Sequence, residues 1–417
     1  MKYIILVPDG LADQPLKELG GKTPMEAART PHMDFMAKHG FSALTQTIPD
    51  GMPPGSDIGN LALMGYDPKK DLSGRASLEA ANVGIKLKDD EVVFRCNLVT
   101  VRELSPSGGM SPSVQGDSSL PDFQMLDYSA GHISSDEAKN LIEHLERALD
   151  WPDLRFYAGK SYRHLMVIKT INVPAMLAIK TVPPHDIMGQ STKSYLPQGP
   201  QSDQLVNIME KSRQILGMHQ INKIREGSKE NPANMVWLWG QGGRSNLPLF
   251  KDRFGLSGSV ISAVDLVNGI GRLAGLDVLS VPGANGYYDT NYKGKADYAL
   301  NSLKKHDFVY VHVEATDEAG HNGDWNAKVK CCEHFDKKIV GPVIKAFGKA
   351  KGVRVLVCPD HPTPIATRTH DRSPVPFVMW GEGIEPNGTK KYSEKEASTK
   401  GLKFKSGQDM IQFFLSK

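Results

Sequence analysis

Three apolar stretches of the sequence each lead into aspartate and histidine residues, and this repeated pattern constrains the fold more than any other feature. The stretches, at about residues 2–8, 308–313 and 353–358, are rich in valine, isoleucine and leucine, as buried strands are. In a mostly parallel sheet the carboxyl ends of the strands lie along one edge, where ligands bind. The residues delivered to that edge are Asp9, Asp317, His321, Asp360 and His361.

The segments between these stretches favour helices. Residues 31–39 follow Thr30-Pro31 and end before Gly40, which are start and stop signals of a helix. Residues 327–347 have apolar residues at helical spacing, and another apolar stretch begins at residue 375, after His370. This alternation predicts an α/β fold with a mostly parallel sheet and helices on both faces.

The chain has 417 residues, which is too long for one ordinary domain. From about residue 85 to 255 the apolar stretches are shorter and the polar loops longer. We therefore expect a discontinuous domain of residues 1–84 and 256–417, with a smaller α/β domain of residues 85–255 inserted into it. Within the insertion we expect a mobile or substrate-facing loop from residue 116, a helix from residue 134, and a strand broken by prolines at residues 171–186.

Composition excludes several classes of partner. The net charge of +3 is spread along the chain, so we predict no nucleic-acid or membrane partner. The longest apolar runs are too short to span a bilayer. The four cysteines form no C-x-x-C pair and residues 1–8 enter a strand directly, so we expect a cytoplasmic protein. No feature requires an oligomer, and we expect a monomer or a small homo-oligomer.

The grouped carboxylates and imidazoles predict a metal centre. Carboxylates gathered at one sheet edge repel one another unless a cation lies among them. With His370 added, their number suits two divalent ions. Mixed Asp/His ligation favours manganese or zinc, and we expect manganese, with zinc, cobalt or magnesium as alternatives. For residues 314–321 taken alone, a solvated acidic loop is an equally good explanation.

Ser56 is the candidate nucleophile. It lies in a Pro-Gly loop before an apolar stretch, residues 61–64, that we expect to be helical. A serine at such a place usually caps the helix. Beside a two-metal centre, activation of its hydroxyl for nucleophilic attack is the better interpretation. The helix N-terminus would also favour a phosphate at that serine.

These motifs resemble the alkaline phosphatase superfamily and, within it, the archaeal-type 2,3-bisphosphoglycerate-independent phosphoglycerate mutases. The resemblance covers essentially the whole chain and is strongest in "VPDGLAD", "TPHMDFMAKHG", "PPGSDIGNLALMGYDP", "GRASLEAA", "TDEAGHNGD", "PDHPTP" and "THDRSPVPF". It implies an alkaline-phosphatase-like sheet, two divalent ions flanking a transiently phosphorylated serine, and no bisphosphoglycerate. By motif match, one ion would be held by Asp317, His321 and His370. The other would be held by Asp9, Ser56, Asp360 and His361.

The resemblance further implies a small phosphorylated substrate, 3-phosphoglycerate, whose glycerate part the inserted domain would hold. A carboxylate and a phosphate attract arginine, lysine and histidine. Each such residue taken alone is more often a surface charge. The candidates are His132, Lys160, Arg163, His185 and Arg244 in the insertion, with Arg75 and Lys295 outside it.

Three alternatives stay open at this point. Relatives with a similar N-terminal pattern have been proposed as homoserine kinases, which would make the chain an ATP-dependent phosphotransferase. A metal-dependent phosphatase fits less well, because hydrolysis needs no retention of the alcohol. A non-catalytic metal-binding protein is the third alternative, and phosphorylation of Ser56 would exclude it.

Overall fold

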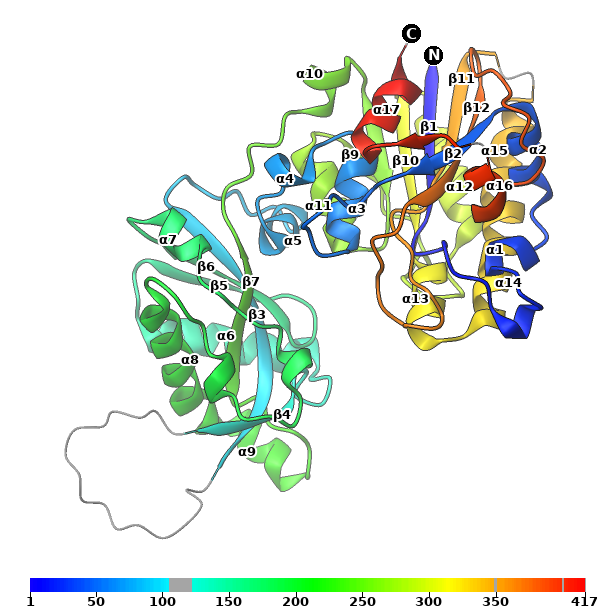
Figure 1. Ribbon diagram of the computed structural model, residues 1–417. Coiled ribbons are helices and arrows are strands. Elements are labelled where there is room, and N and C mark those ends of the chain that lie inside the picture. Colours follow the sequence, from blue (N-terminus) through cyan, green and yellow to red (C-terminus); the bar gives the residue numbers. More distant parts are fainter. Residues whose placement is uncertain (105–121, 349–350, 400, 417) are drawn as a thin grey trace, which may run out of the picture. The chain divides into compact units, whose positions relative to one another are not determined.

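The computed structural model describes residues 1–104, 122–348, 351–399 and 401–416 (Figure 1). The chain forms two compact units. Unit 1 comprises Met1–Leu72, Ala81–Val83 and Asn246–Lys417, and unit 2 comprises Ser73–Ala80 and Gly84–Ser245. Among the described residues, no helix combines the length and apolar character that crossing a membrane requires.

Unit 1 is built on an eight-stranded sheet with the strand order β13-β2-β12-β11-β1-β10-β8-β9. The β11–β12 and β12–β2 pairs are antiparallel, and the other neighbours pair in parallel. The predicted mostly parallel sheet is therefore confirmed. The strands are β1 (Lys2–Pro8), β2 (Phe41–Thr45), β8 (Gly258–Ile261), β9 (Asp277–Val278), β10 (Phe308–Val313), β11 (Val353–Val357), β12 (Val375–Gly381) and β13 (Lys403–Phe404).

Helices cover both faces of this sheet (Figure 1). Ile4 and Leu6 of β1 pack in a core with α2, α12 and α14, whereas the ring of Tyr3 contacts Phe414 of α17, 5.8 Å away. The helices of unit 1 are α1 (Pro24–Ala27), α2 (Pro31–His39), α3 (Ser56–Leu63), α4 (Pro68–Asp71), α10 (Phe250–Phe254), α11 (Asp265–Leu273), α12 (Tyr292–Ser302), α13 (Ala315–Asn322), α14 (Trp325–Phe335), α15 (Gly341–Ala346), α16 (Glu394–Thr399) and α17 (Gly407–Leu415), with short η1 (Lys17–Leu19) and π-helical η4 (Asp336–Val340). Helix α5 (Arg75–Asn82) divides between the two units.

The three central strands set the position of the site. Strand β1 lies between β10 and β11 and pairs with both in parallel. Pro8 is level with Val313, and Leu6 is level with Val357. The residues that follow these three strands therefore emerge at one edge of the sheet.

Unit 2 contains a five-stranded antiparallel sheet in which β3 pairs with β4, β6 and β7. Helices α6 and α8 pack on one face over a core of apolar side chains. The strands are β3 (Glu91–Glu103), β4 (Phe123–Asp127), β5 (Leu154–Tyr157), β6 (Arg163–Lys169) and β7 (Met235–Gly242). The helices are α6 (Ser135–Leu149), α7 (Val173–Leu177), α8 (Ser202–Gly217) and α9 (Gln220–Gly227), with η2 (Pro184–Ile187) and η3 (Lys193–Tyr195).

Within the insertion, residues 171–186 differ from the sequence-based prediction, and the loop predicted from residue 116 is only partly described. Residues 171–186 form α7 and η2, so the predicted strand is wrong. The reason is that Asn172 caps α7 by accepting from the backbone N–H of Ala175, and Pro174 suits the first helical turn. Of the loop predicted from residue 116, residues 116–121 lie outside the described part of the chain, and Phe123–Asp127 form β4.

A buried ion pair joins three segments of unit 1. The side chains of Lys328 on α14 and Asp13, which follows β1, have no exposed surface, and their Nζ and Oδ2 atoms are 2.7 Å apart. Lys328 also donates to the carbonyl of Thr363, 2.8 Å away, and Asp13 accepts from the backbone N–H of Ile365. The pair therefore fixes the segment that follows β11.

We expect Lys328→Met to lower the free energy of unfolding by about 3–5 kcal/mol, because it leaves the Asp13 carboxylate buried without its cation. The matched control is Lys330→Met on the same helix, where the side chain is exposed, and this change should shift stability by less than about 0.5 kcal/mol. Urea unfolding of both variants measures the difference. A loss below about 1 kcal/mol for Lys328→Met would show that the pair is unimportant.

Candidate active site

The structure brings the six predicted aspartate and histidine residues together beyond the ends of β1, β10 and β11. Three sets of side chains have ligand atoms that lie within 4.8 Å of one another. Two of the sets share Asp9 and two share Asp317, so all of them form one cluster. The sets are Asp317, His321 and His370; Asp9, Asp317 and His361; and Asp9, His312 and Asp360.

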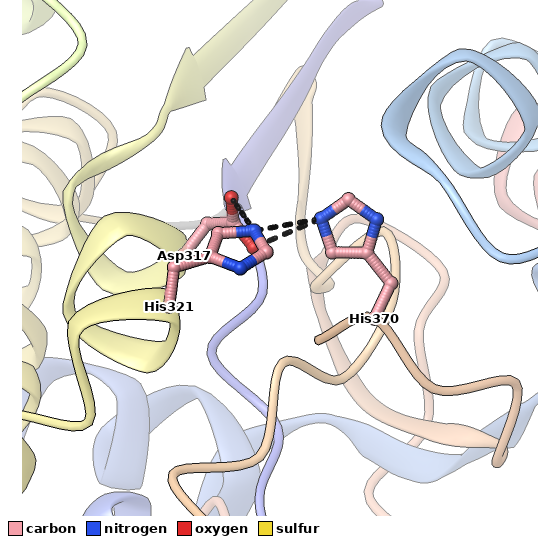
Figure 2. Close-up of side chains that lie close together, drawn as sticks. All are labelled: Asp317, His321 and His370. Carbon is pink, nitrogen blue, oxygen red and sulfur yellow. Dashed lines mark hydrogen bonds and ion pairs between the residues drawn. The ribbon is translucent and has the colours of Figure 1, made fainter. Parts of the chain in front are cut away.

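Asp317, His321 and His370 face one another (Figure 2). Asp317 and His321 are four residues apart on α13, which places them on the same side of the helix. Nε2 of His321 is 3.2 Å from Oδ2 of Asp317, and Nε2 of His370 is 3.5 Å from Oδ1. The two Nε2 atoms are 3.0 Å apart. Adjacent ligands at about 2.1 Å from one octahedral ion are also about 3.0 Å apart.

In His321 and His361 the hydrogen bond of Nδ1 orients the ring so that Nε2 lies in the cluster, where it can act as a ligand. Nδ1 of His321 lies 2.9 Å from the carbonyl oxygen of Arg368, and Nδ1 of His361 lies 3.3 Å from that of Pro362. A carbonyl oxygen can only accept, so Nδ1 is the protonated nitrogen in each ring. Metal-binding histidines are usually oriented in this way by a partner of the other ring nitrogen.

Asp9, Asp360 and His361 form the deeper part of the cluster, and all three are buried. Nε2 of His361 is 3.5 Å from Oδ1 of Asp9 and 3.5 Å from Oδ2 of Asp360. Asp360 accepts from the backbone N–H of Gly10 at 3.2 Å and from Nδ2 of Asn60 at 2.7 Å. By contrast, Oδ1 of Asp9 is buried and makes no hydrogen bond within the part of the chain that the structure describes.

The charges of this cluster are unbalanced without a cation. Burial raises the pKa of Asp9 well above its usual range, and repulsion from Asp360 and Asp317 raises it further. Burial alone would also raise the pKa of Asp317, but its contacts with His321 and His370 outweigh this and hold that pKa well below its usual range. An unpaired buried carboxylate oxygen beside imidazole nitrogens is the donor set of a site for divalent ions of the Mn²⁺ or Zn²⁺ kind, so the residues present fit such ions.

Ser56 is the first residue of α3, and Gly55 occupies the capping position. No side-chain cap hydrogen bond is formed at this helix start. The hydroxyl oxygen of Ser56 lies instead 3.2 Å from Nε2 of His361. The explanation of Ser56 as a helix cap is therefore wrong, and its hydroxyl belongs to the cluster.

Three residues of the site escaped the sequence analysis. His312 is enclosed by apolar residues within β10, where only its polarity could have drawn attention. Asn60 lies four residues after Ser56 on α3, a spacing that could have revealed it, and it accepts a hydrogen bond from Tyr310 at 2.6 Å. The hydroxyl of Thr363 donates to Asp317. Thr363 lies within the quoted motif "PDHPTP", although it was not singled out as a site residue.

Unit 2 gathers cationic side chains on one face of its sheet. Cys96 of β3 points into the core of unit 2, so the alternating residues Arg95 and Asn97 point to the opposite face. Arg163 of β6 pairs with Asn97 and lies on that same face. Arg95, which the sequence analysis missed, shares this face with the predicted Arg163.

Aromatic rings and two predicted histidines lie on the same part of unit 2. The guanidinium carbon of Arg95 is 3.9 Å from the ring centre of Trp239, and the ring of His185 is 5.5 Å from that of Trp239. The ring of His132 is 6.0 Å from that of Tyr162. Stacking of this kind holds a guanidinium in a fixed orientation.

The positive charges of the arginines on this face repel one another, and the effect is seen in the pKa of Arg95. Burial lowers the pKa of Arg95, the ion pair with Glu79 at 3.1 Å opposes that change, and the charges of Arg75 and Arg163 lower the pKa further. We call Arg75, Arg95 and Arg163 the arginine cluster. Of the carboxylates that the structure describes, Glu79 alone forms an ion pair with this cluster, so its three cations would attract an anion.

The other predicted substrate residues lie in different surroundings. Lys160 is exposed, and Arg244 is exposed with its Nη1 2.7 Å from Asp89. Lys295 is fully buried in unit 1, where Nζ donates to the carbonyl of His312 at 2.7 Å and to Glu314 at 3.1 Å. The predicted contact between Lys295 and substrate is not supported by this position.

A family model described as 2,3-bisphosphoglycerate-independent phosphoglycerate mutase matches residues 37–222. A protein of Geobacter sulfurreducens named "Probable 2,3-bisphosphoglycerate-independent phosphoglycerate mutase" is 46% identical over 418 residues, which cover 100% of both chains. The chain belongs to the 2,3-bisphosphoglycerate-independent phosphoglycerate mutase family. The resemblance inferred from the motifs is thus confirmed.

Other proteins match this chain over nearly its whole length. A Methanosarcina acetivorans protein with the family's name is 44% identical over 413 residues, 99% of this chain and 98% of its own. A solved structure from Pyrococcus horikoshii aligns with a TM-score of 0.80 and 28% identity, covering 100% of this chain and 98% of that one. A cofactor-independent phosphoglycerate mutase from Thermoplasma acidophilum has a TM-score of 0.67 at 24% identity and 100% and 99% coverage, which supports the fold.

We expect Asp317→Asn to remove one divalent ion from the cluster of aspartates and histidines, because a neutral amide is a poorer ligand than a carboxylate. Metal content after dialysis against Mn²⁺, measured by plasma mass spectrometry, gives the number of ions per chain. The control is Asp297→Asn on α12, an exposed carboxylate that pairs with Lys293. Equal metal content in both variants would contradict the assignment of Asp317 as a ligand.

Proposed function

We propose that this chain interconverts 3-phosphoglycerate and 2-phosphoglycerate without bisphosphoglycerate, through a phosphoserine at Ser56. Unit 1 would hold two divalent ions and carry the phosphoryl group, and unit 2 would hold the glycerate. The names of the family members support the reaction. The position of Ser56 within the carboxylate and imidazole cluster supports the mechanism.

The single observation that carries the mechanism is the direction of the Ser56 hydroxyl. Its oxygen lies 3.2 Å from Nε2 of His361, and Ser56 is the first residue of α3, where the helix N-terminus favours a phosphate. Asn60 donates to both the Ser56 carbonyl and Asp360, at 2.8 and 2.7 Å. Asn60 thereby fixes the start of α3 relative to the cluster.

Divalent ions bound by Asp317, His321 and His370 and by Asp9, Ser56, Asp360 and His361 would lower the pKa of the serine hydroxyl and offset the charge of the transferred group. The sets found in the structure place His361 with Asp9 and Asp317, so the division of ligands between the two ions stays a proposal. Manganese stays the expected ion, with zinc, cobalt and magnesium as alternatives that reconstitution would separate.

The reaction has two balanced halves. The Ser56 hydroxyl loses its proton as its oxygen bonds to phosphorus, the bond between phosphorus and the 3-oxygen breaks, and the 3-oxygen takes up a proton. The glycerate stays bound, and its 2-hydroxyl then attacks the phosphoserine and loses its proton. The second bond break restores the Ser56 hydroxyl, so no phosphate is gained or lost.

The arginine cluster is the proposed site for the glycerate carboxylate. A planar guanidinium can bind a carboxylate through two hydrogen bonds, and Arg95 is held rigid by Trp239 and Glu79. His132 and His185 border the cluster and offer further contacts. Lys160 and Arg244 remain candidates, whereas Lys295 is better explained as a positioning residue inside unit 1. A cytoplasmic location and a monomeric or small homo-oligomeric state stay predictions.

The reaction is tested directly by adding 3-phosphoglycerate, without bisphosphoglycerate, to the Mn²⁺-loaded protein. We expect 2-phosphoglycerate, detected with an enolase-coupled assay. EDTA should abolish the activity and Mn²⁺ should restore it. Parallel reactions with homoserine plus ATP, and with release of inorganic phosphate as the readout, test the kinase and phosphatase alternatives. Turnover only in one of those reactions would overturn the proposal.

Ser56→Ala should abolish turnover while changing the free energy of unfolding by less than about 0.5 kcal/mol, because the hydroxyl caps no helix. The matched control is Ser406→Ala. Ser406 caps α17 by accepting from the backbone N–H of Asp409 at 3.0 Å, so its loss should cost about 1 kcal/mol of stability and leave turnover intact. Mass spectrometry of the wild type trapped with substrate should find the phosphate on Ser56. Substantial turnover in Ser56→Ala would refute the mechanism.

Arg95→Gln should raise the KM for 3-phosphoglycerate by roughly 10- to 100-fold, because the free energy of one hydrogen bond to a charged group corresponds to a change in affinity of about that size. Arg147→Gln on α6 is the control, since this arginine is exposed and lies outside the arginine cluster. Initial rates over a range of substrate concentrations separate KM from kcat. An unchanged KM in Arg95→Gln would remove the arginine cluster from the proposed substrate site.

A further inference from the structure

His312 is a buried histidine whose Nε2 atom faces the cluster of aspartates and histidines. It lies in β10 with no exposed surface, and Nε2 is 3.1 Å from Oδ2 of Asp9. Although the two atoms are close, Nε2 has no hydrogen bond to any residue in the described ranges. The other carboxylate oxygen of Asp9, Oδ1, faces His361 at 3.5 Å. Asp9 therefore lies between two imidazoles and presents a different oxygen to each.

Nδ1 of His312 contacts Glu314, which in turn is paired with the buried Lys295. Nδ1 is 3.2 Å from Oε1 of Glu314 and 3.2 Å from Oγ of Ser262. Glu314 also accepts from the backbone N–H of Ala263 at 3.0 Å and from Nζ of Lys295 at 3.1 Å. Because an ionised carboxylate only accepts, Nδ1 of His312 carries a proton. A neutral ring then has its lone pair on Nε2.

This arrangement matches that of the predicted ligands His321 and His361. In all three residues Nδ1 is bonded to an oxygen acceptor, and Nε2 lies 3.1–3.5 Å from a carboxylate oxygen of the cluster. A carboxylate behind the ring, as Glu314 is, is a common partner of metal-bound histidine. His312 thus has the surroundings of a ligand, although no motif of the sequence pointed to it.

A lone pair on Nε2 facing a carboxylate oxygen is repulsive unless a positive charge lies beside both atoms. Among the described residues Nε2 has no hydrogen-bond partner, although Oδ2 of Asp9 is only 3.1 Å away. The distance of 3.1 Å between Nε2 of His312 and Oδ2 of Asp9 is close to the distance of about 3.0 Å between adjacent ligands of one ion. Asp360 has a ligand atom within 4.8 Å of both residues.

We propose that Nε2 of His312 binds a divalent cation together with Asp9 and Asp360, and that Glu314 and Lys295 position the ring. The nitrogen ligand suits Mn²⁺, Zn²⁺ or Co²⁺ better than Mg²⁺ or Ca²⁺. The inference rests on the metal binding proposed above and not on the reaction. It adds His312 to the seven residues predicted as ligands and gives Lys295 a role that does not require contact with substrate.

Metal binding, measured without turnover, tests this directly. His312→Gln in the metal-stripped full chain, titrated with Mn²⁺ by calorimetry, should weaken one ion by at least about 10-fold. The matched control is His164→Gln. His164 is also buried with an unpaired Nε2, but its Nδ1 accepts from the backbone N–H of Gly159 at 3.0 Å, so Nε2 carries the proton. This variant should bind Mn²⁺ like the wild type.

Asp317→Asn in the same titration separates the two proposals. If Asp317→Asn loses an ion and His312→Gln binds as the wild type does, the inference about His312 fails and the metal centre stands. If both variants bind as the wild type does, the metal centre itself is refuted. A weakened ion in His312→Gln, with unchanged binding in His164→Gln, supports the inference.

Two measurements keep the test decisive if His312→Gln does not fold. Glu314→Gln keeps the imidazole but weakens its orientation, and it should reduce the affinity for one ion by about 10- to 100-fold. In a crystal of the wild type soaked with ZnCl₂, anomalous scattering should place a metal about 2.1 Å from Nε2 of His312. Zinc bound elsewhere in the cluster, with none in contact with this nitrogen, would overturn the proposal.

Discussion

Repulsion among buried carboxylates is the constraint on which the rest of unit 1 depends. Asp9, Asp317 and Asp360 follow neighbouring strands and are buried together, and no described residue forms a hydrogen bond with Oδ1 of Asp9. Water has little access to these groups, so most of the free energy that stabilises their charge would come from imidazoles and the proposed cations. Burial of these charges destabilises the fold, but electrostatic interactions with a charged substrate are stronger in a site from which water is already excluded.

Much of the surrounding polar structure serves to hold these groups in place. Lys328 and Asp13 fix the segment that follows β11, and Thr363 in that segment donates to Asp317. Tyr310 orients Asn60, which in turn contacts Asp360. These side chains touch no proposed substrate, yet each restricts the position of a ligand. Such supporting contacts are what keep a metal site within a fraction of an ångström of its working geometry.

The sequence predicted those parts of the site that follow strands and missed those that depend on packing. Asp9 and Asp360 were predictable because polar residues directly after apolar strands must lie at the sheet edge. His312 was not, because a strand buried on both faces gives no alternation that would assign one residue to the site. Arg95 depends on which face of β3 is covered, and a single strand does not reveal that. Residues 171–186 contain β-branched residues typical of strands, but the cap formed by Asn172 favoured a helix.

The strand register of β1 has a consequence for biosynthesis. Among the described residues, β1 pairs with β10 and β11, beginning with Tyr3 opposite Phe308 and Lys2 opposite Val353. At about 5–20 residues per second, the ribosome needs on the order of tens of seconds to reach these partners. All of unit 2 is synthesised in that interval and can form its own sheet. Until β10 and β11 have been synthesised, β1 therefore lacks its partner strand on both sides, and its apolar residues and unpaired backbone groups are prone to aggregate. Chaperones would be most needed during this interval.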